Sequence, residues 1–228
     1  MVLDAVFLGM NDAGKEVYEW LNQREDIEIK VLLTEKEQLG LIKDLEPEIV
    51  ISSGFEHKVP EDIIEVPERG IINLHPSYLP YNKGAHPYVW PIIEGTPAGV
   101  SIHKMNKHID EGPILAKRKV NVRLEDTAKD LYERLEQEQA QLFKDTWTKI
   151  KNNELEEEIQ DPSDGTLHYR KDFDEASRLD PTKTVQIGNF LDRLRGLTYP
   201  PHNTVYFERD GKRYYIEIDI EVKDVQRD

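Results

Sequence analysis

Short apolar runs alternate with stretches of helical periodicity along the first half of the chain. The runs, such as "LDAVFLG" and "EIVISSG", have the length and residue types of buried strands. The stretches between them repeat apolar residues at intervals of three and four, which is the pattern of an amphipathic helix. Predicted strands span residues 3–9, 27–33, 48–54 and 70–75. Strands that alternate with helices predict a parallel, doubly wound sheet with right-handed connections.

The pattern changes in the second half of the chain. Two apolar runs, residues 98–106 and 112–122, are separated only by "KHIDE", and so short a connection favours an antiparallel pair. A long amphipathic helix is predicted over residues 126–153, with Asp126 and Thr127 as candidate N-caps.

An acidic stretch, "NNELEEEIQDPSDG", follows the long helix and ends in proline and glycine, so we interpret it as a linker. Beyond it come a predicted helix and two alternating runs joined through Asp210-Gly211, which is the signature of a β-hairpin. The expected fold is α/β: a Rossmann-like, doubly wound, mostly parallel sheet with a small C-terminal helix and β-hairpin extension. The expected parts are residues 1–153, 154–165 and 166–228.

The composition narrows the class of protein. Hydrophobic residues make up 38% of the 228 residues, enough for a substantial core, and the formal net charge is -15. This acidic excess argues against nucleic acid as a partner, because phosphate backbones require clustered Lys and Arg. Cysteine is absent, which excludes disulfides, thiolate metal ligands and cysteine nucleophiles. With no basic signal-peptide region and no apolar run of membrane-spanning length, we expect a cytoplasmic protein without a membrane partner.

The first predicted strand is followed by "GMNDAGKE", residues 9–16, which nearly matches a phosphate-binding loop. Glu16 stands where that motif needs a hydroxyl group for magnesium, and its charge would repel phosphate. We therefore interpret the stretch as a tight turn from strand to helix that lines a pocket.

Asn73 and His75 end the fourth predicted strand, and side chains two residues apart on a strand point to the same side. They would emerge at the carboxyl edge of a parallel sheet, where such folds bind ligands. An asparagine there can donate a hydrogen bond to a developing oxyanion, and a histidine can carry a proton near neutral pH. Taken alone, both residues more simply satisfy the polar end of a strand.

Asp110 lies in the short loop between the two later apolar runs. An aspartate so close to a glycine is ordinarily a turn residue. A carboxylate brought to the imidazole of His75 would, however, stabilise its charged form and orient it. The amide, the imidazole and the carboxylate are informative only as a set.

The stretch "NLHPSYLPYNKGAHP", followed by "HIDEGPIL", closely resembles the signature of the folate-dependent formyltransferases, and the similarity extends over residues 1–153. The resemblance implies a catalytic domain that transfers a formyl group from the cosubstrate N10-formyltetrahydrofolate to an amine, without a metal. Asn73, His75 and Asp110 occupy the positions of the family's catalytic residues. The implied folate-binding residues are Gly54, Phe55, Val59, His108 and Ile109.

Members of this family differ in the amine that they formylate. The enzymes for initiator methionyl-tRNA carry a larger C-terminal domain and a basic surface, and those for phosphoribosylglycinamide end soon after the long helix. The loop after His75 and the stretch "RLRGLTYPP" most resemble the sugar N-formyltransferases, which act on amino-dideoxy sugars attached to dTDP, GDP or UDP. We expect a dTDP-4-amino-4,6-dideoxyhexose as acceptor, for a cell-surface glycan such as lipopolysaccharide O-antigen. The other two acceptors are the alternatives.

In that subgroup, the region corresponding to residues 166–228 implies sugar-nucleotide binding and a homodimer contact, which we expect on the exposed face of the hairpin. Arg195 is expected at the pyrophosphate, because Arg193 faces elsewhere on the helix; an ion pair between Arg195 and Asp192 is the alternative. The predicted acceptor-binding residues are Gly9, Asn11, Ser77, Tyr78, Lys83, Gly84, Lys171, Arg195 and Tyr199, the last of which would stack on the base or anchor the Pro-Pro turn.

Two other classes of function remain open. A metal-dependent hydrolase would draw its ligands from His75, His86, His103, His108 and Asp110, although their spacing matches none of the familiar metal motifs. A non-catalytic protein would bind a sugar nucleotide in the same pocket without turnover.

Overall fold

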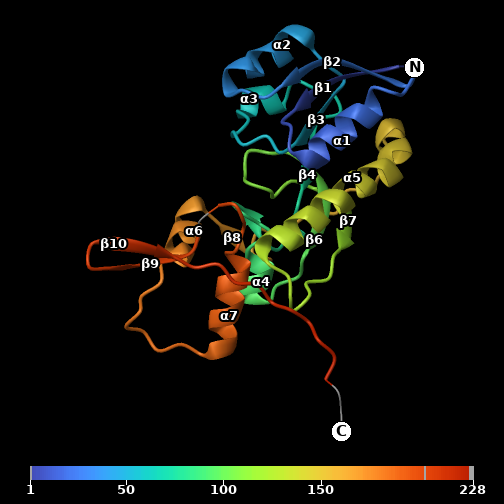
Figure 1. Ribbon diagram of the computed structural model, residues 1–228. Helices are drawn as coiled ribbons and strands as arrows, with labels where there is room; N and C mark the ends of the chain where they lie inside the picture. The colour runs from blue at the N-terminus through green and yellow to red at the C-terminus, as the bar shows by residue number, and fades with distance from the viewer. Residues whose placement is uncertain (1, 203, 226–228) are drawn as a thin grey trace.

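A six-stranded sheet forms the centre of the protein (Figure 1). The structure is a computed structural model that describes residues 2–202 and 204–225. The strands are β1 (Leu3–Leu8), β2 (Ile27–Leu33), β3 (Ile49–Ser53), β4 (Ile71–His75), β6 (Gly99–Lys104) and β7 (Ile114–Lys119), in the order β2-β1-β3-β4-β6-β7. The first four are parallel, β6 runs antiparallel to β4, and β7 runs antiparallel to β6. The predicted α/β class with a mostly parallel sheet is confirmed.

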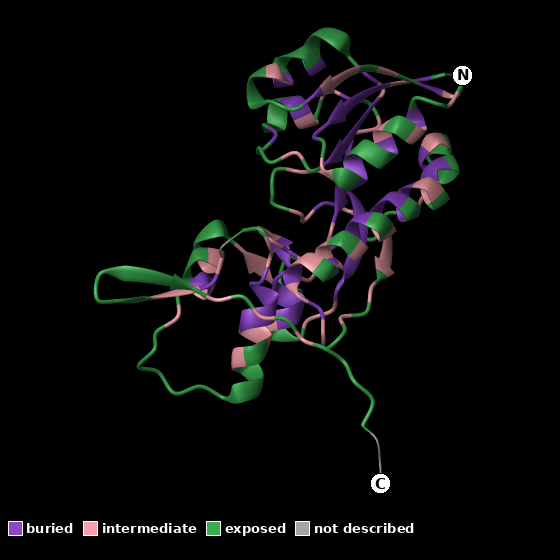
Figure 2. Ribbon diagram, viewed as in Figure 1, coloured by how far each residue is buried: buried purple, intermediate pink, exposed green. Residues whose placement is uncertain are grey.

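Helices cover both faces of the sheet, which explains why its inner strands are almost entirely buried (Figure 2). One face carries α1 (Asp12–Leu21) and α5 (Ala128–Asn152), and the other carries η1 (Lys36–Gly40), α2 (Leu41–Leu45) and α3 (Glu61–Ile64). Alternate residues of β1 serve the two faces: Phe7 packs toward α1 and α5, and Val6 packs toward α2 and α3. Within the described ranges, the structure contains no helix long and apolar enough to cross a membrane.

The long helix α5 begins at a capping box. The hydroxyl of Thr127 accepts a hydrogen bond from the N–H of Asp130, and the Asp130 carboxylate accepts one from the N–H of Thr127. Thr127 is therefore the N-cap, whereas Asp126 accepts from the N–H of Arg123 and pairs with Arg134. Both candidate caps are thus used, but for different purposes.

The C-terminal part packs against α4 (Trp90–Glu94) rather than standing apart from the sheet domain. It contains α6 (Arg170–Ser177), which the sequence analysis did not predict, α7 (Ile187–Gly196), and a hairpin of β9 (Tyr206–Arg209) and β10 (Lys212–Tyr215). A third apolar cluster joins Trp90 of the first part to Leu194 and Val205 of the second. The predicted Asp210-Gly211 turn is confirmed, with φ angles of 50° and 71°.

The acidic segment after α5 is fixed to the preceding domain at several points. The backbone groups of Glu158 and Ile114 pair in both directions at 2.9 Å. Further on, β8 (Leu167–His168) pairs in parallel with β5 (Lys83–Gly84), in the loop that follows β4. The acidic residues of this segment are therefore exposed side chains of a stretch that is paired with the domain, and the segment is not a free linker. The division of the chain into three parts stays a prediction.

Candidate active site

Pairing of β4 with β6 places Asn73 directly opposite His103 in the antiparallel register. The side-chain nitrogen of Asn73 lies 3.2 Å from Nε2 of His103, while Nδ1 of His103 lies 3.0 Å from the carbonyl oxygen of Lys104. Because a carbonyl can only accept, Nδ1 of His103 carries a proton, and Nε2 lies between the Asn73 amide and the Asp110 carboxylate, 3.5 Å from the latter.

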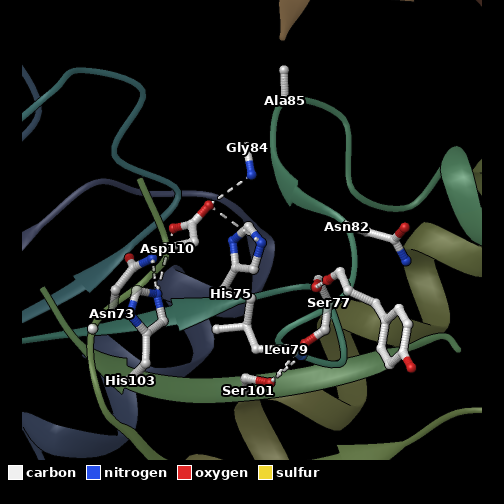
Figure 3. Close-up of polar contacts among 12 residues, drawn as sticks. Asn73, His75, Ser77, Leu79, Asn82, Gly84, Ala85, Ser101, His103 and Asp110 are labelled. Carbon is white, nitrogen blue, oxygen red and sulfur yellow. Dashed lines mark hydrogen bonds and ion pairs between the residues drawn. The ribbon is translucent and has the colours of Figure 1, made fainter. Parts of the chain in front are cut away.

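Asp110 stands between two histidines that belong to different strands (Figure 3). One carboxylate oxygen lies 3.6 Å from Nε2 of His75, and the other lies 3.5 Å from Nε2 of His103. The first oxygen also accepts the N–H of Gly84 at 2.8 Å. A Cβ at Gly84, where φ is +87°, would overlap the carbonyl oxygen of His168. The three residues predicted as a set therefore meet, and His103 joins them.

The electrostatics of the cluster favour a neutral imidazole beside an ionised carboxylate. Burial lowers the pKa of His75 below 6.5, although the Asp110 carboxylate acts in the opposite direction. Burial raises the pKa of Asp110, but His75, His103 and the Gly84 N–H together hold it well below its usual range. Nε2 of His75 is buried and has no hydrogen-bond partner among the described residues, so it is free to accept a proton.

The loop after β4 is held by its own hydrogen bonds. Ser77, predicted to bind the acceptor, donates from its hydroxyl to the carbonyl of Tyr81. Its own carbonyl accepts from the hydroxyl of Ser101 at 2.8 Å, and that hydroxyl in turn accepts the N–H of Leu79 at 3.1 Å. Ser77 is buried, and these contacts argue that it shapes the loop instead of touching a ligand.

Two further predicted acceptor residues have partners within the protein. The ammonium groups of Lys117 and Lys119 lie 5.2 and 5.3 Å from the ring centre of Tyr78, beside the edge strand β7. The Lys83 side chain is buried, and its ammonium lies 3.6 Å from the carboxylate of Glu111. Neither side chain is poised toward an open site.

The turn after β1 confirms that the phosphate-loop similarity is a matter of backbone shape. A Cβ at Gly9 would overlap the carbonyl oxygen of Ser53, so this glycine serves close packing. Asn11 caps α1 by accepting the N–H of Gly14 at 2.9 Å. The carboxylate of Glu136 lies near the N–H groups of Asp12 and Ala13 in the first turn of α1, and burial raises its pKa. A protein carboxylate thus lies at the helix end where a phosphate-binding loop would hold its ligand.

The predicted folate residues lie on two segments. Gly54 (φ +71°) ends β3, Phe55 is partly buried on the second apolar cluster, and Val59 is buried in it. Val59 can therefore meet a ligand only through its backbone. On the loop that carries Asp110, His108 is exposed and the side chain of Ile109 is 44% exposed. An exposed apolar side chain beside a buried carboxylate is a suitable surface for a flat ring.

A cavity of about 450 Å³ lies between the sheet domain and the C-terminal part. Of the nine predicted acceptor residues, only Tyr199 lines it. The lining consists of Glu56, His86, Tyr88, Val89, Ala128, Tyr132, Phe173, Gly196, Leu197, Tyr199, His202 and Thr204. Aromatic residues dominate, and no Lys or Arg of the described chain is among them, so the cavity suits a neutral, flat or ring-shaped group.

Three tyrosines form one wall of this cavity. The ring centres of Tyr88 and Tyr132 are 4.7 Å apart, and Tyr199 lies within 6 Å of both. Burial raises the pKa of Tyr88 to about 12 and also raises the pKa of Tyr132 and of Tyr199. All three phenols are therefore neutral near pH 7 and present hydroxyl groups that can donate.

Arg195 makes its contacts within the protein. It is buried, and its guanidinium donates to the Asp192 carboxylate at 2.8 Å and to the carbonyls of Arg123 and Asp126. These contacts tie α7 to the turn before α5 and include the ion pair with Asp192 that was the alternative, although Arg195 is buried and not on the surface; the pyrophosphate role stays a prediction. Arg193 faces away, as expected, and donates to carbonyls around the end of α6.

Lys171 is exposed, with its ammonium 5.7 Å from the ring centre of Tyr169. Burial lowers the pKa of His86 at the cavity, and the charge of Arg170, the neighbour of Lys171, acts in the same direction. His86 itself stacks on Phe173, with ring centres 4.1 Å apart.

The five candidate metal ligands do not form one cluster. His75, His103 and Asp110 lie together, whereas His86 lines the cavity and His108 is exposed. In residues 2–202 and 204–225, no group of three His, Asp or Glu side chains is arranged to hold a metal ion.

Sequence reasoning named His103 and His86 only as possible metal ligands of a hydrolase, and it did not place them in this site. His103 could have been found by pairing the two predicted strands, because it stands opposite Asn73 in the register. The cavity residues His86, Tyr132 and Phe173 come from segments far apart in the chain and show no local signal.

Comparisons with known proteins agree with this geometry. A family model described as "Formyl transferase" matches residues 17–146, and one described as "N-formyltransferase dimerization C-terminal domain" matches residues 172–222. The dTDP-4-amino-4,6-dideoxyglucose formyltransferase of Mycobacterium tuberculosis is 29% identical over 76% of this chain and 74% of that protein. The GDP-perosamine N-formyltransferase of Brucella melitensis is 30% identical over 78% of this chain and 67% of that protein.

Among solved structures, the formyltransferase PseJ from Anoxybacillus kamchatkensis is 31% identical to this chain. It superposes with a TM-score of 0.66 over 75% of this chain and 88% of that one. That structure is a complex with UDP-4,6-dideoxy-4-formamido-L-AltNAc and tetrahydrofolate.

The shifted pKa values of His75 and Asp110 predict the outcome of an NMR titration of the His75 imidazole. We expect a midpoint below 6.5, because burial outweighs the carboxylate. In Asp110→Asn the charge that raises the pKa of His75 is gone, so the midpoint should fall further. Asp161→Asn, which changes an exposed turn residue, is the control and should leave the midpoint unchanged. A midpoint at or above 6.5, or no response to Asp110→Asn, would contradict the described electrostatics.

Proposed function

This chain belongs to the formyl transferase family, and from that premise we propose that it moves a formyl group from N10-formyltetrahydrofolate to the amine of a nucleotide-linked amino-dideoxy sugar. The observation that carries the proposal is the juxtaposition of two features. The Asn73–His75–Asp110 cluster lies at the sheet edge, and the loop whose Gly84 N–H binds Asp110 continues to His86, which lines an aromatic cavity built from both family regions of the chain. The relatives named above act on dTDP- and GDP-linked amino sugars, which supports this acceptor class.

Asn73 would stabilise the charge that develops on the formyl oxygen. When the neutral amine attacks the formyl carbon, that oxygen becomes negative. The contact of the Asn73 amide nitrogen with Nε2 of His103 would fix the plane of the amide. His103 thereby acts as a positioning residue for Asn73.

His75 would take the proton that the attacking amine must lose. Its neutral imidazole and unpartnered Nε2 suit a base, since its pKa lies below the working pH. Once Nε2 is protonated, the N–H would point toward the Asp110 carboxylate 3.6 Å away, which stabilises the imidazolium. The proton can then be passed to the departing folate nitrogen, so the base is restored.

The acceptor would place its neutral ring system in the aromatic cavity. The lining offers phenol donors and stacking faces but, in the described chain, no cation, so the diphosphate must lie outside it. Arg170 at the rim is the cation that we assign to the diphosphate. Tyr199 would then contact the acceptor directly.

The folate would approach from the opposite side of Asp110. Ile109 supplies an exposed apolar face, with His108 beside it, and the backbone from Gly54 through Phe55 to Val59 supplies hydrogen-bonding groups at the end of β3. Tetrahydrofolate in the similar PseJ complex supports a folate as the formyl donor. When bound, the folate supplies the formyl group as an activated amide.

Among the family's acceptors, the sugar nucleotide fits this chain best. The C-terminal match to a dimerization domain and the net charge of -15 both disfavour tRNA. A dTDP-4-amino-4,6-dideoxyhexose destined for a cell-surface glycan such as O-antigen is the first acceptor to test. We place the reaction in the cytoplasm, where nucleotide sugars and folates are both available.

A panel of amino-sugar nucleotides carrying dTDP, GDP or UDP, each mixed with N10-formyltetrahydrofolate, tests the proposal. The expected result is one acceptor that gains the mass of a single formyl group while tetrahydrofolate is released. Binding without turnover would favour the non-catalytic alternative, and turnover that depends on an added divalent metal would favour the hydrolase.

Loss of the catalytic groups is expected to lower turnover without unfolding the protein. Asn73→Ala, His75→Asn and Asp110→Ala should each reduce kcat by about a hundredfold or more, because each removes charge stabilisation or proton transfer in the transition state. The matched control is Asn152→Ala at an exposed helix end. Near-normal turnover in any two of the three variants would refute the assignment.

Removal of a cavity tyrosine is expected to weaken acceptor binding selectively. Tyr199→Ala should raise KM for the sugar nucleotide about tenfold and leave KM for the folate unchanged, because the stacking surface is lost. Tyr169→Ala, which removes an exposed tyrosine outside the lining, is the control. An equal rise in both KM values would show that the cavity does not hold the acceptor.

The hairpin is proposed as a homodimer surface, because β9 and β10 project from the body of the protein (Figure 1) and carry the stacked rings of Phe207 and Tyr214, of which Tyr214 is 42% exposed. Light scattering at micromolar protein should give twice the mass of one chain, and Tyr214→Glu should give the single-chain mass. Leu41→Glu, equally exposed at 42% on α2, is the control and should remain dimeric. A single-chain mass for the unaltered protein would refute the proposal.

A further inference from the structure

The turn that carries Asp110 has a backbone that requires support. Asp110 has a φ of +54°, in the left-handed backbone region that residues other than glycine adopt uncommonly. Two residues later, a Cβ at Gly112 would overlap the carbonyl oxygen of Lys104, so the turn is pressed against the end of β6. The position of the carboxylate therefore depends on what holds this turn in place.

Gln160 holds both ends of the turn. Its side-chain amide nitrogen donates to the carbonyl of Asp110 at 2.9 Å and to the carbonyl of Gly112 at 2.6 Å. The residue lies in the acidic segment after α5, yet it is only 8% exposed. The pairing of Glu158 with Ile114, two residues earlier, fixes the backbone from which this side chain extends.

The buried environment makes these hydrogen bonds specific. The side-chain oxygen of Gln160 is buried without a partner among the described residues, so this acceptor is unsatisfied while the amide nitrogen makes both hydrogen bonds. The amide nitrogen is the group that holds the turn, because it donates to the carbonyls of Asp110 and Gly112. A side chain of similar volume without a donor would leave two carbonyl oxygens unsupported.

We propose that Gln160 is a positioning residue for formyl transfer, whose amide clamps the Asp110–Gly112 turn and thereby sets where the Asp110 carboxylate meets His75 and His103. The inference rests on the proposed function but concerns a residue outside both matched family regions. Gln160 touches neither histidine in this arrangement and acts through Asp110.

The test compares Gln160→Met, which keeps the volume but removes the donor, with Glu158→Gln, an exposed change in the same segment. Gln160→Met should lower kcat by about ten- to a hundredfold, because a displacement of about 1 Å at a catalytic group has effects of that size. KM for both substrates should stay within about twofold. Glu158→Gln should match the unaltered protein.

A second readout separates positioning from general stability. His75 faces Asp110 on the loop, His103 on β6 and the backbone of Asn82. If Asp110 recedes, its charge no longer raises the pKa of His75, so the NMR titration midpoint of His75 and the acidic limb of the kcat/KM profile should both move to lower pH in Gln160→Met. Thermal unfolding of each variant shows whether the fold is retained.

Several outcomes would overturn the proposal. A kcat for Gln160→Met within about twofold of the unaltered protein would do so, as would a loss of kcat with an unchanged His75 titration. If Gln160→Met does not fold, Gln160→Ala replaces it, since a water molecule can then bridge the two carbonyls; failure of both to fold would make Gln160 a folding determinant only. An unaltered protein inactive on every acceptor would refute the proposed function, while the titration would still test the clamp.

Discussion

The ionised carboxylate of Asp110, only 14% exposed at the edge of the sheet, is the constraint on which the site depends. A buried charge is tolerated only where hydrogen bonds and opposite or polar partners replace the water that it has lost. Here those partners come from three places: His75 on β4, His103 on β6 and the N–H of Gly84 in the loop between them. The carboxylate therefore fixes the positions of three segments relative to one another.

This constraint also explains why the chain beyond α5 is part of the site. Gly84 can present its N–H to Asp110 because the loop pairs with β8, and Gln160 from the same segment holds the turn behind the carboxylate. The next elements, α6 and α7, complete the aromatic cavity. The proposed acceptor site and the catalytic cluster thus share one continuous support, so a change in the C-terminal part should affect both.

The acidic character of the protein is compatible with an anionic acceptor only if the charged part of that acceptor lies away from the carboxylates, of which Glu56 lines the cavity. Glu136 lies near the N–H groups at the start of α1, so its carboxylate stands where that helix end would otherwise attract a phosphate. The cavity beyond it is aromatic and holds its tyrosines neutral through burial. Such a site recognises the uncharged rings of a ligand by stacking and phenol hydrogen bonds, and leaves its charged part for the rim.

The sequence by itself determined the sheet, the long helix, the hairpin turn and the identity of Asn73, His75 and Asp110, because strand periodicity, turn chemistry and a contiguous motif are all local in the chain. It did not determine the surroundings of those residues. Nothing in the sequence indicated that Arg195 is buried against backbone carbonyls, and the acidic segment looked like a tether although it carries Gln160. Contacts between residues about fifty to seventy positions apart depend on how packed elements meet, and only the tertiary structure decides that.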